Sequence, residues 1–224
     1  MEDKQRNLVA LILTAPASTI VLVLSTMFGG IIGSFIYVFG KVWQVVVPSL
    51  WRLKIEKLPI SKSPPPERSI REGIVLGIAM SFVMFIAWLV VGDKINPEEV
   101  RSFVKPFGLL NIWFYLAVFF YWVTLNSLLE EYLFRWFIFE KFETIVGGKW
   151  AVILAGITFT SHHLFGTAAM FPWWAALLAS FGVFIGGVMW SWLYLRHRSI
   201  WPCYVSHVIV DITMFSIGAY ILFS

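Results

Sequence analysis

The chain of 224 residues is 59% hydrophobic and only 13% charged, and its mean hydropathy is +0.80. A soluble domain carries about 25% charged residues, so the composition excludes that class and predicts an integral membrane protein with one domain, residues 1–224. The net charge of +4 comes from Lys and Arg in loops, so we expect membrane lipids around the chain and no nucleic-acid partner. The single cysteine, Cys203, excludes an intrachain disulfide.

Runs without Asp, Glu, Lys or Arg predict six or seven membrane-spanning helices. The first run, 7–40, is either one long tilted helix or two helices separated at Gly29-Gly30. We expect an all-α, polytopic helical bundle around an intramembrane polar cavity. The later spans are predicted at 73–92, 110–129, 151–195 (a hairpin with its turn at 166–172) and 200–223.

The distribution of basic residues predicts the orientation. Loop 41–72 holds seven of the 17 Lys and Arg, and stretches 135–149 and 196–198, on the same side, hold three and two. Loop 93–105, on the opposite side, holds three. The positive side is predicted to be the cytoplasmic face of the cell membrane. The same rule favours seven spans, because Lys4 and Arg6 then also lie on that side.

The most informative stretch is Glu130-Glu131-Tyr132-Leu133-Phe134-Arg135, which directly follows the apolar run 110–129. Glu131 and Arg135 are four residues apart and share a helix face. One interpretation is an ion pair that ends the helix at the cytoplasmic surface. Adjacent glutamates at a helix C-terminus oppose the macrodipole, however, and carboxylates within lipid are by default functional.

Two later spans carry histidines. Phe159-Thr160-Ser161-His162-His163 has two adjacent imidazoles, which point to different helix faces, so we expect only one of them, His163, to line a site with the glutamates. His207 and Asp211 are four residues apart in the last span and share a face. Each group has a structural interpretation as well, a hydrogen-bonded packing histidine or a buried polar pair.

The combination suggests chemistry more strongly than any single group. Glutamate and histidines around one cavity can activate water and stabilise an oxyanion. They can also ligate zinc, although the zinc-protease motif His-Glu-x-x-His is absent and the sequence requires no cofactor. Buried Glu and His residues would also suit a transporter coupled to protons or metal ions.

The three motifs together resemble the CPBP family of intramembrane proteases, which includes the type II CAAX prenyl endopeptidase and the Abi (bacteriocin-immunity) proteins. The resemblance rests on Glu-Glu-x-x-x-Arg at 130–135, Phe-x-x-x-His at 159–163 and His-x-x-x-Asp at 207–211. It covers about 110–215. The resemblance implies a membrane endopeptidase that cleaves a peptide or lipidated protein near the cytoplasmic face. Some members have been called metalloproteases, and others are non-catalytic immunity or scaffold proteins.

The resemblance also implies residue roles. Glu130 would be the general base, supported by the pair Glu131 and Arg135, and His163 would help to hold the water. His207 and the residue at 211 would bind the oxyanion, but many members have Asn at 211. Because an ionised Asp only accepts hydrogen bonds, we expect Asp211 to accept a hydrogen bond from His207 and to orient its ring.

One geometric expectation conflicts with these roles. If its span ends at 129, Glu130 lies at the cytoplasmic end, whereas His163 lies 14 residues, or ~21 Å, from Lys149 at that end. The two can meet only if the stretch 137–149, which we expect to be interfacial, dips into the membrane or if the span of His163 begins above the surface.

Overall fold

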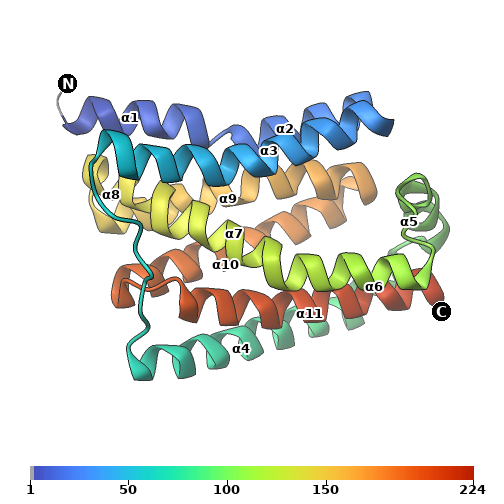
Figure 1. Cartoon of the computed structure of the whole chain (residues 1–224). Coiled ribbons are helices and arrows are strands. Elements are labelled where there is room, and N and C mark those ends of the chain that lie inside the picture. The colour runs from blue at the N-terminus through green and yellow to red at the C-terminus, as the bar shows by residue number, and fades with distance from the viewer. Residues whose placement is uncertain (1–2) are drawn as a thin grey trace.

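The computed structural model describes residues 3–224, which form helices and connecting segments without a strand. The helices run nearly along one axis, with α1, α2 and α3 on one side of the bundle and α4 on the other (Figure 1). Their bounds are α1 Asp3–Thr14, α2 Ala17–Phe28, α3 Gly30–Leu50, α4 Glu67–Val91, α5 Pro97–Val104, α6 Ile112–Phe120, α7 Ser127–Glu131, α8 Glu140–Val146, α9 Gly148–Met170, α10 Trp173–His197 and α11 Trp201–Phe223.

Seven helical stretches are long and apolar enough to cross a membrane, which confirms the all-α, polytopic bundle and makes the protein a multi-pass integral membrane protein. The stretch Ile112–Val146 joins α6, α7 and α8 through two π-helical segments, and Asp3–Phe28 joins α1 and α2. The stretches are Asp3–Phe28, Gly30–Ile55, Glu67–Lys94, Ile112–Val146, Gly148–Met170, Trp173–His197 and Trp201–Phe223.

The charge-free N-terminal run forms two spans, as the orientation argument favoured. The chain reverses at Gly29 and Gly30, whose φ angles are +59° and +51°, a conformation that costs glycine little. The second span then continues to Ile55. The prediction that a polar loop begins at Lys41 is therefore wrong, because this lysine lies inside α3.

The helices approach one another closely where glycine removes the side chain. A Cβ atom on Gly73 of α4 would lie 2.2 Å from the carbonyl oxygen of Pro202 in α11. A Cβ atom on Gly187 of α10 would lie 3.1 Å from the Cα atom of Gly156 in α9. Such contacts between small residues are the usual way for helices to pack tightly inside a membrane.

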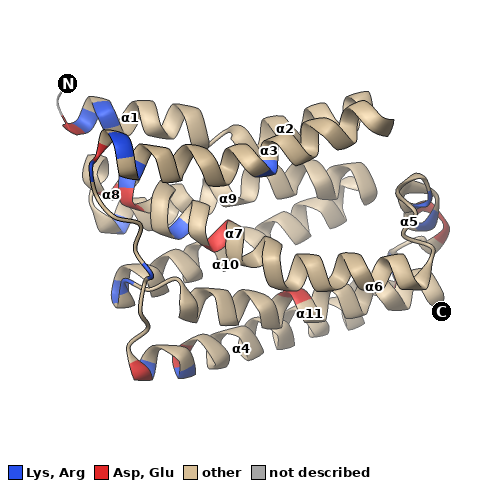
Figure 2. Ribbon diagram, in the orientation of Figure 1, with Lys and Arg blue, Asp and Glu red and all other residues tan. Residues whose placement is uncertain are grey.

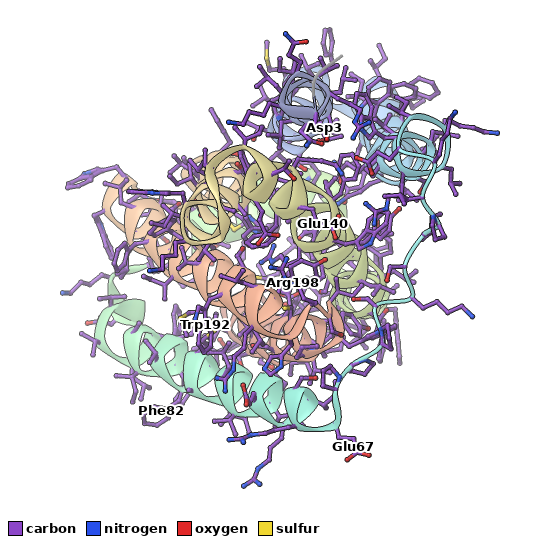
Figure 3. All side chains as sticks on the ribbon, turned by 90° about the vertical axis from the view of Figure 1, so that its left-hand side faces the viewer. Asp3, Glu67, Phe82, Glu140, Trp192 and Arg198 are labelled. Carbon is purple, nitrogen blue, oxygen red and sulfur yellow. The ribbon has the colours of Figure 1, made fainter. Side chains whose placement is uncertain are left out.

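Charged residues gather at the end of the bundle where the N-terminus lies and around α5 at the opposite end (Figure 2). Figure 3 looks onto the N-terminal end, where the labelled Asp3, Glu67, Glu140 and Arg198 come from segments far apart in the sequence. At this end the Glu143 carboxylate accepts two hydrogen bonds from Arg198, at 2.5 and 2.7 Å, and raises the pKa of that guanidinium.

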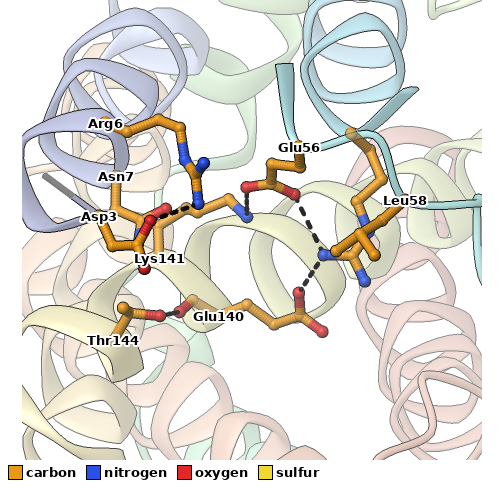
Figure 4. A pocket seen from close by; sticks show the side chains of 9 residues that line it. Asp3, Arg6, Asn7, Glu56, Leu58, Glu140, Lys141 and Thr144 are labelled. Carbon is orange, nitrogen blue, oxygen red and sulfur yellow. Dashed lines mark hydrogen bonds and ion pairs between the residues drawn. The ribbon is translucent and has the colours of Figure 1, made fainter. Parts of the chain in front are cut away.

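A network of ion pairs at this end ties the segment that follows α3 to α8, around a cavity of about 260 Å³ that α1 also lines (Figure 4). Arg52 lies 3.1 Å from Glu56 and 3.3 Å from Glu140. Lys141 lies 2.5 Å from Glu56. Glu130 is ten residues from Glu140 along the helix, so it lies ~15 Å from the level of this network.

Candidate active site

The predicted motif lies in the middle of a helix rather than at its end. The stretch Ile112–Val146 is one 35-residue helical rod in which two π-helical segments, Tyr121–Asn126 and Tyr132–Phe139, flank α7. Such wide turns inside α-helices often occur at functional sites. The prediction that the span ends at 129 is therefore wrong, because the helix continues to Val146.

The helix continues beyond the motif because the residues that follow it are apolar and buried. Every residue from Leu133 to Phe139 is buried, including Arg135, which is 0% exposed. Glu131 and Arg135 neutralise each other, so the helix continues through them. This arrangement resolves the expected conflict, because Glu130 lies deep in the bundle at the level of the histidines and not at its charged end.

Glu131 is fully committed to partners inside the protein. Its Oε2 atom lies 3.1 Å from Arg135 Nε, and both side chains are 0% exposed. Its Oε1 atom accepts a hydrogen bond of 2.8 Å from His207 Nδ1. The guanidinium of Arg135 lies over the rings of Phe159 and Trp190, at 4.6 and 5.3 Å, which further stabilises its charge. Glu131 therefore holds α7 and α11 in register.

Glu130 has one committed carboxylate oxygen and one open one. Asn126 Nδ2 donates a hydrogen bond of 2.9 Å to Glu130 Oε1. His162 Nε2 lies 3.7 Å from the same oxygen, and His207 Nε2 lies 3.9 Å from Oε2. Both separations exceed a direct hydrogen bond and suit a bridging water. Glu130 is 7% exposed, whereas Glu131 is 0% exposed.

Both histidines of α9 face the glutamate, so the expectation that only one of them lines the site is wrong. Glu130, His162 and His163 each offer one ligand atom within 4.8 Å of the others. His163 Nδ1 lies 3.0 Å from the carbonyl oxygen of Phe159 and must donate to it, which leaves Nε2 as the acceptor. The two imidazole rings lie 4.1 Å apart. The sequence interpretation set His162 aside because adjacent residues usually diverge on a helix.

The predicted hydrogen bond between His207 and Asp211 is absent among the described residues 3–224. His207 Nε2 lies 3.6 Å from Asp211 Oδ2, and the other ring nitrogen donates to Glu131. Asp211 Oδ2 instead accepts a hydrogen bond of 2.7 Å from Ser127 Oγ. The prediction that Asp211 orients the ring is wrong, because the nearer carboxylate of Glu131 fills that role. Trp190 stacks on the imidazole at 4.3 Å and fixes its plane.

The six predicted residues therefore meet in one place: Glu130, Glu131, Arg135, His163, His207 and Asp211. The structure adds His162, together with three residues that the sequence interpretation did not select. Asn126 and Ser127 bind two of the carboxylates directly. Lys41 of α3 donates to the oxygen of the Asn126 amide.

Comparison with known proteins agrees with this geometry. A family model described as type II CAAX prenyl endopeptidase Rce1-like matches residues 111–213. That segment contains the helical rod Ile112–Val146, here called the motif helix, together with α9, α10 and the first half of α11. It therefore contains all six predicted site residues. No curated protein and no solved structure matches the chain. The part of the chain that carries the site, residues 111–213, thus matches the Rce1-like family of type II CAAX prenyl endopeptidases, the group that the three motifs resemble.

Proposed function

We propose that the protein is an intramembrane endopeptidase in which Glu130 activates the attacking water. The observation that carries the proposal is the contrast between two neighbouring carboxylates. Glu131 Oε1 accepts a hydrogen bond from His207 and Oε2 forms an ion pair with the buried Arg135 at 3.1 Å. Glu130 Oε2 accepts no hydrogen bond from the described residues, and the nearest cationic nitrogen, His207 Nε2, lies 3.9 Å away. A general base needs such a free oxygen within reach of a water.

In the proposed reaction, Glu130 Oε2 takes a proton from the water while the water oxygen attacks the scissile carbonyl carbon. The carbonyl π bond breaks and an oxyanion forms. Glu130 then gives its proton to the leaving nitrogen as the carbon–nitrogen bond breaks, so the carboxylate is regenerated. The products are one carboxylic acid and one amine.

The oxyanion would be stabilised from α11. With Nδ1–H donated to Glu131, His207 keeps Nε2 for the substrate side, and the imidazolium form donates from that atom. His207 Nε2 lies 3.9 Å from Glu130 Oε2 and 3.6 Å from Asp211 Oδ2, so the donor lies beside the base. A single donor to an oxyanion is worth about 10²–10³-fold in kcat.

The donor set also fits a divalent cation, because one carboxylate and two imidazoles are typical zinc ligands. Glu130, His162 and His163 would hold such an ion. A bound zinc would supply Lewis-acid polarisation of water. Our proposal needs only the carboxylate as base, and it makes the metal content of the protein a direct test.

The proposed substrate is a peptide segment that reaches the site through the membrane, such as the C-terminus of a lipidated protein. Two features support this. The family match is to prenyl endopeptidases, and an apolar groove of about 430 Å³ lies beside the site between α3 and the motif helix, lined by Tyr37, Leu129 and four valines of α3. We place the protein in the cell membrane, with the basic end of the bundle in the cytoplasm.

The test is cleavage by the purified protein in liposomes. A farnesylated CAAX peptide and a set of membrane-spanning peptides are offered to the wild type, to Glu130→Gln and to the control Glu143→Gln, which alters a carboxylate at the basic end. We expect the wild type and the control to cleave, and Glu130→Gln to lose at least 10²-fold in rate. Substantial cleavage by Glu130→Gln contradicts the assignment. Proton or metal flux without cleavage would favour a transporter, and neither activity would favour an immunity or scaffold role.

A further inference from the structure

Lys41 is a half-buried basic residue inside α3 and outside the segment matched by the family. It is the only charged residue between Arg6 and Arg52, and it lies eleven residues after the start of α3, ~17 Å along the helix. In Figure 2, where Lys and Arg are blue, the middle of α3 carries blue colour. A charge at such a depth is costly and marks function by default, provided that its partner can be named.

The partner is the amide that holds Glu130. Lys41 Nζ donates a hydrogen bond of 2.5 Å to Asn126 Oδ1, and Asn126 Nδ2 donates one of 2.9 Å to Glu130 Oε1. Asn126 is 1% exposed. The ammonium also lies 5.5 Å from the centre of the Tyr37 ring, which adds a cation–π contact. The result is a continuous polar chain from α3 to the proposed base.

The hydrogen bonds from Lys41 through Asn126 to Glu130 all run in one direction, from donor to acceptor. An ammonium can only donate hydrogen bonds, whereas an amide has one side that donates and one that accepts. Lys41 therefore requires the oxygen of Asn126 on the α3 side, and this turns the NH₂ group toward Glu130. Without Lys41 the amide loses this constraint and can turn its oxygen toward the carboxylate, which repels it.

We propose that Lys41 is a positioning residue for the general base. Through Asn126 it holds Oε1 of Glu130 in a hydrogen bond and leaves Oε2 free to accept a proton from the water. The inference rests on the proposed function for its catalytic consequence, whereas the hydrogen-bonded chain itself can be tested without turnover. Lys41 also lines the apolar groove, so direct contact with substrate is the competing role that the experiment has to separate.

The experiment measures kcat and KM separately for Lys41→Met, Lys41→Arg, Asn126→Leu and the double variant Lys41→Met/Asn126→Leu in the same liposomes. Gln44→Met, which removes a buried polar side chain one turn further along α3, is the matched control. For Lys41→Met we expect kcat to fall about 10- to 100-fold, the range found for groups that orient a catalytic ligand, with KM within about twofold. Lys41→Arg should recover most of the rate.

Because Lys41 acts through Asn126, the double variant should be no slower than Asn126→Leu alone, within about twofold. A wild-type rate for Lys41→Met, a loss confined to KM, or losses that multiply in the double variant would each overturn the inference. If wild type and Glu130→Gln behave as proposed and Lys41→Met is fully active, only the inference fails. If the wild type cleaves nothing, the proposed function fails. The Tm values of Lys41→Met, Asn126→Leu and the double variant are then compared, and Tm losses of the single variants that add up in the double variant would overturn the inferred hydrogen-bonded chain.

Discussion

Replacement of Glu131 by Gln should destabilise the protein far more than the same replacement of its neighbour Glu130. Arg135 is 0% exposed, and the only carboxylate that compensates its charge among residues 3–224 is Glu131, at 3.1 Å. Neither Nη atom of the guanidinium has a hydrogen-bond partner among the described residues. Glu131→Gln therefore leaves a buried, unpaired cation.

The magnitude follows from the burial. Removing one partner of a buried ion pair costs about 3–5 kcal/mol. The Gln oxygen can still accept the hydrogen bond from His207, so we take the lower value. With about 2–4 °C per kcal/mol for a chain of this size, Tm should fall by about 6–12 °C. Glu130→Gln should cost less than half of this, because Asn126 can still donate to the amide oxygen and Lys41 is only half-buried.

The assay is thermal unfolding in one detergent at one heating rate, because membrane proteins often unfold irreversibly and Tm then depends on the scan. Arg135→Met/Glu131→Gln, which removes both charges, should recover part of the lost stability. If the Tm of Glu131→Gln lies within about 2 °C of the wild-type value, or if the double variant has a lower Tm than the single one, the ion pair does not stabilise the fold as its burial indicates.

Two further predictions concern the site. If Glu130 alone activates water, chelators should leave the rate unchanged and elemental analysis should find less than one metal ion per chain. The prediction is refuted if one zinc ion per chain restores activity after metal removal and if His162→Ala or His163→Ala no longer binds that ion. Asp211→Asn should keep the rate within about tenfold, because the amide oxygen still accepts from Ser127 and the amide nitrogen can donate to the oxyanion. Asp211→Leu should lose about 10²–10³-fold. Equal losses in the two variants would show that the ionised carboxylate itself matters.

The fold and most of the site could be predicted because membrane sequences carry strong local signals. Charge-free runs predicted the spans, and the basic loops favoured seven of them. Three short motifs selected Glu130, Glu131, Arg135, His163, His207 and Asp211. These signals act within one helix. They fail where a charge is neutralised inside the membrane, because a neutralised charge no longer marks a helix end.

Lys41 and Arg135 are two examples of this failure, one with a distant partner in the sequence and one with a near partner. Each was interpreted as the start of a polar stretch, and each lies inside a span. Arg135 is neutralised by a residue one turn away, so its burial could have been inferred from the sequence spacing. Lys41 bonds to Asn126, 85 residues further along the chain, and no local pattern predicts that pairing. Long-range compensation of this kind becomes visible only once the helices are placed side by side.

The same compensation decides which carboxylate can do chemistry. In a medium without water, every buried charge needs a partner, so roles follow from the atoms that remain after partners are assigned. Arg135 and His207 take both oxygens of Glu131, and Ser127 takes one oxygen of Asp211. Glu130 is held at one oxygen only, by a donor that Lys41 orients. Under the proposed function, the Glu-Glu motif thus consists of one structural and one reactive carboxylate, and the helices that each one faces decide which is which.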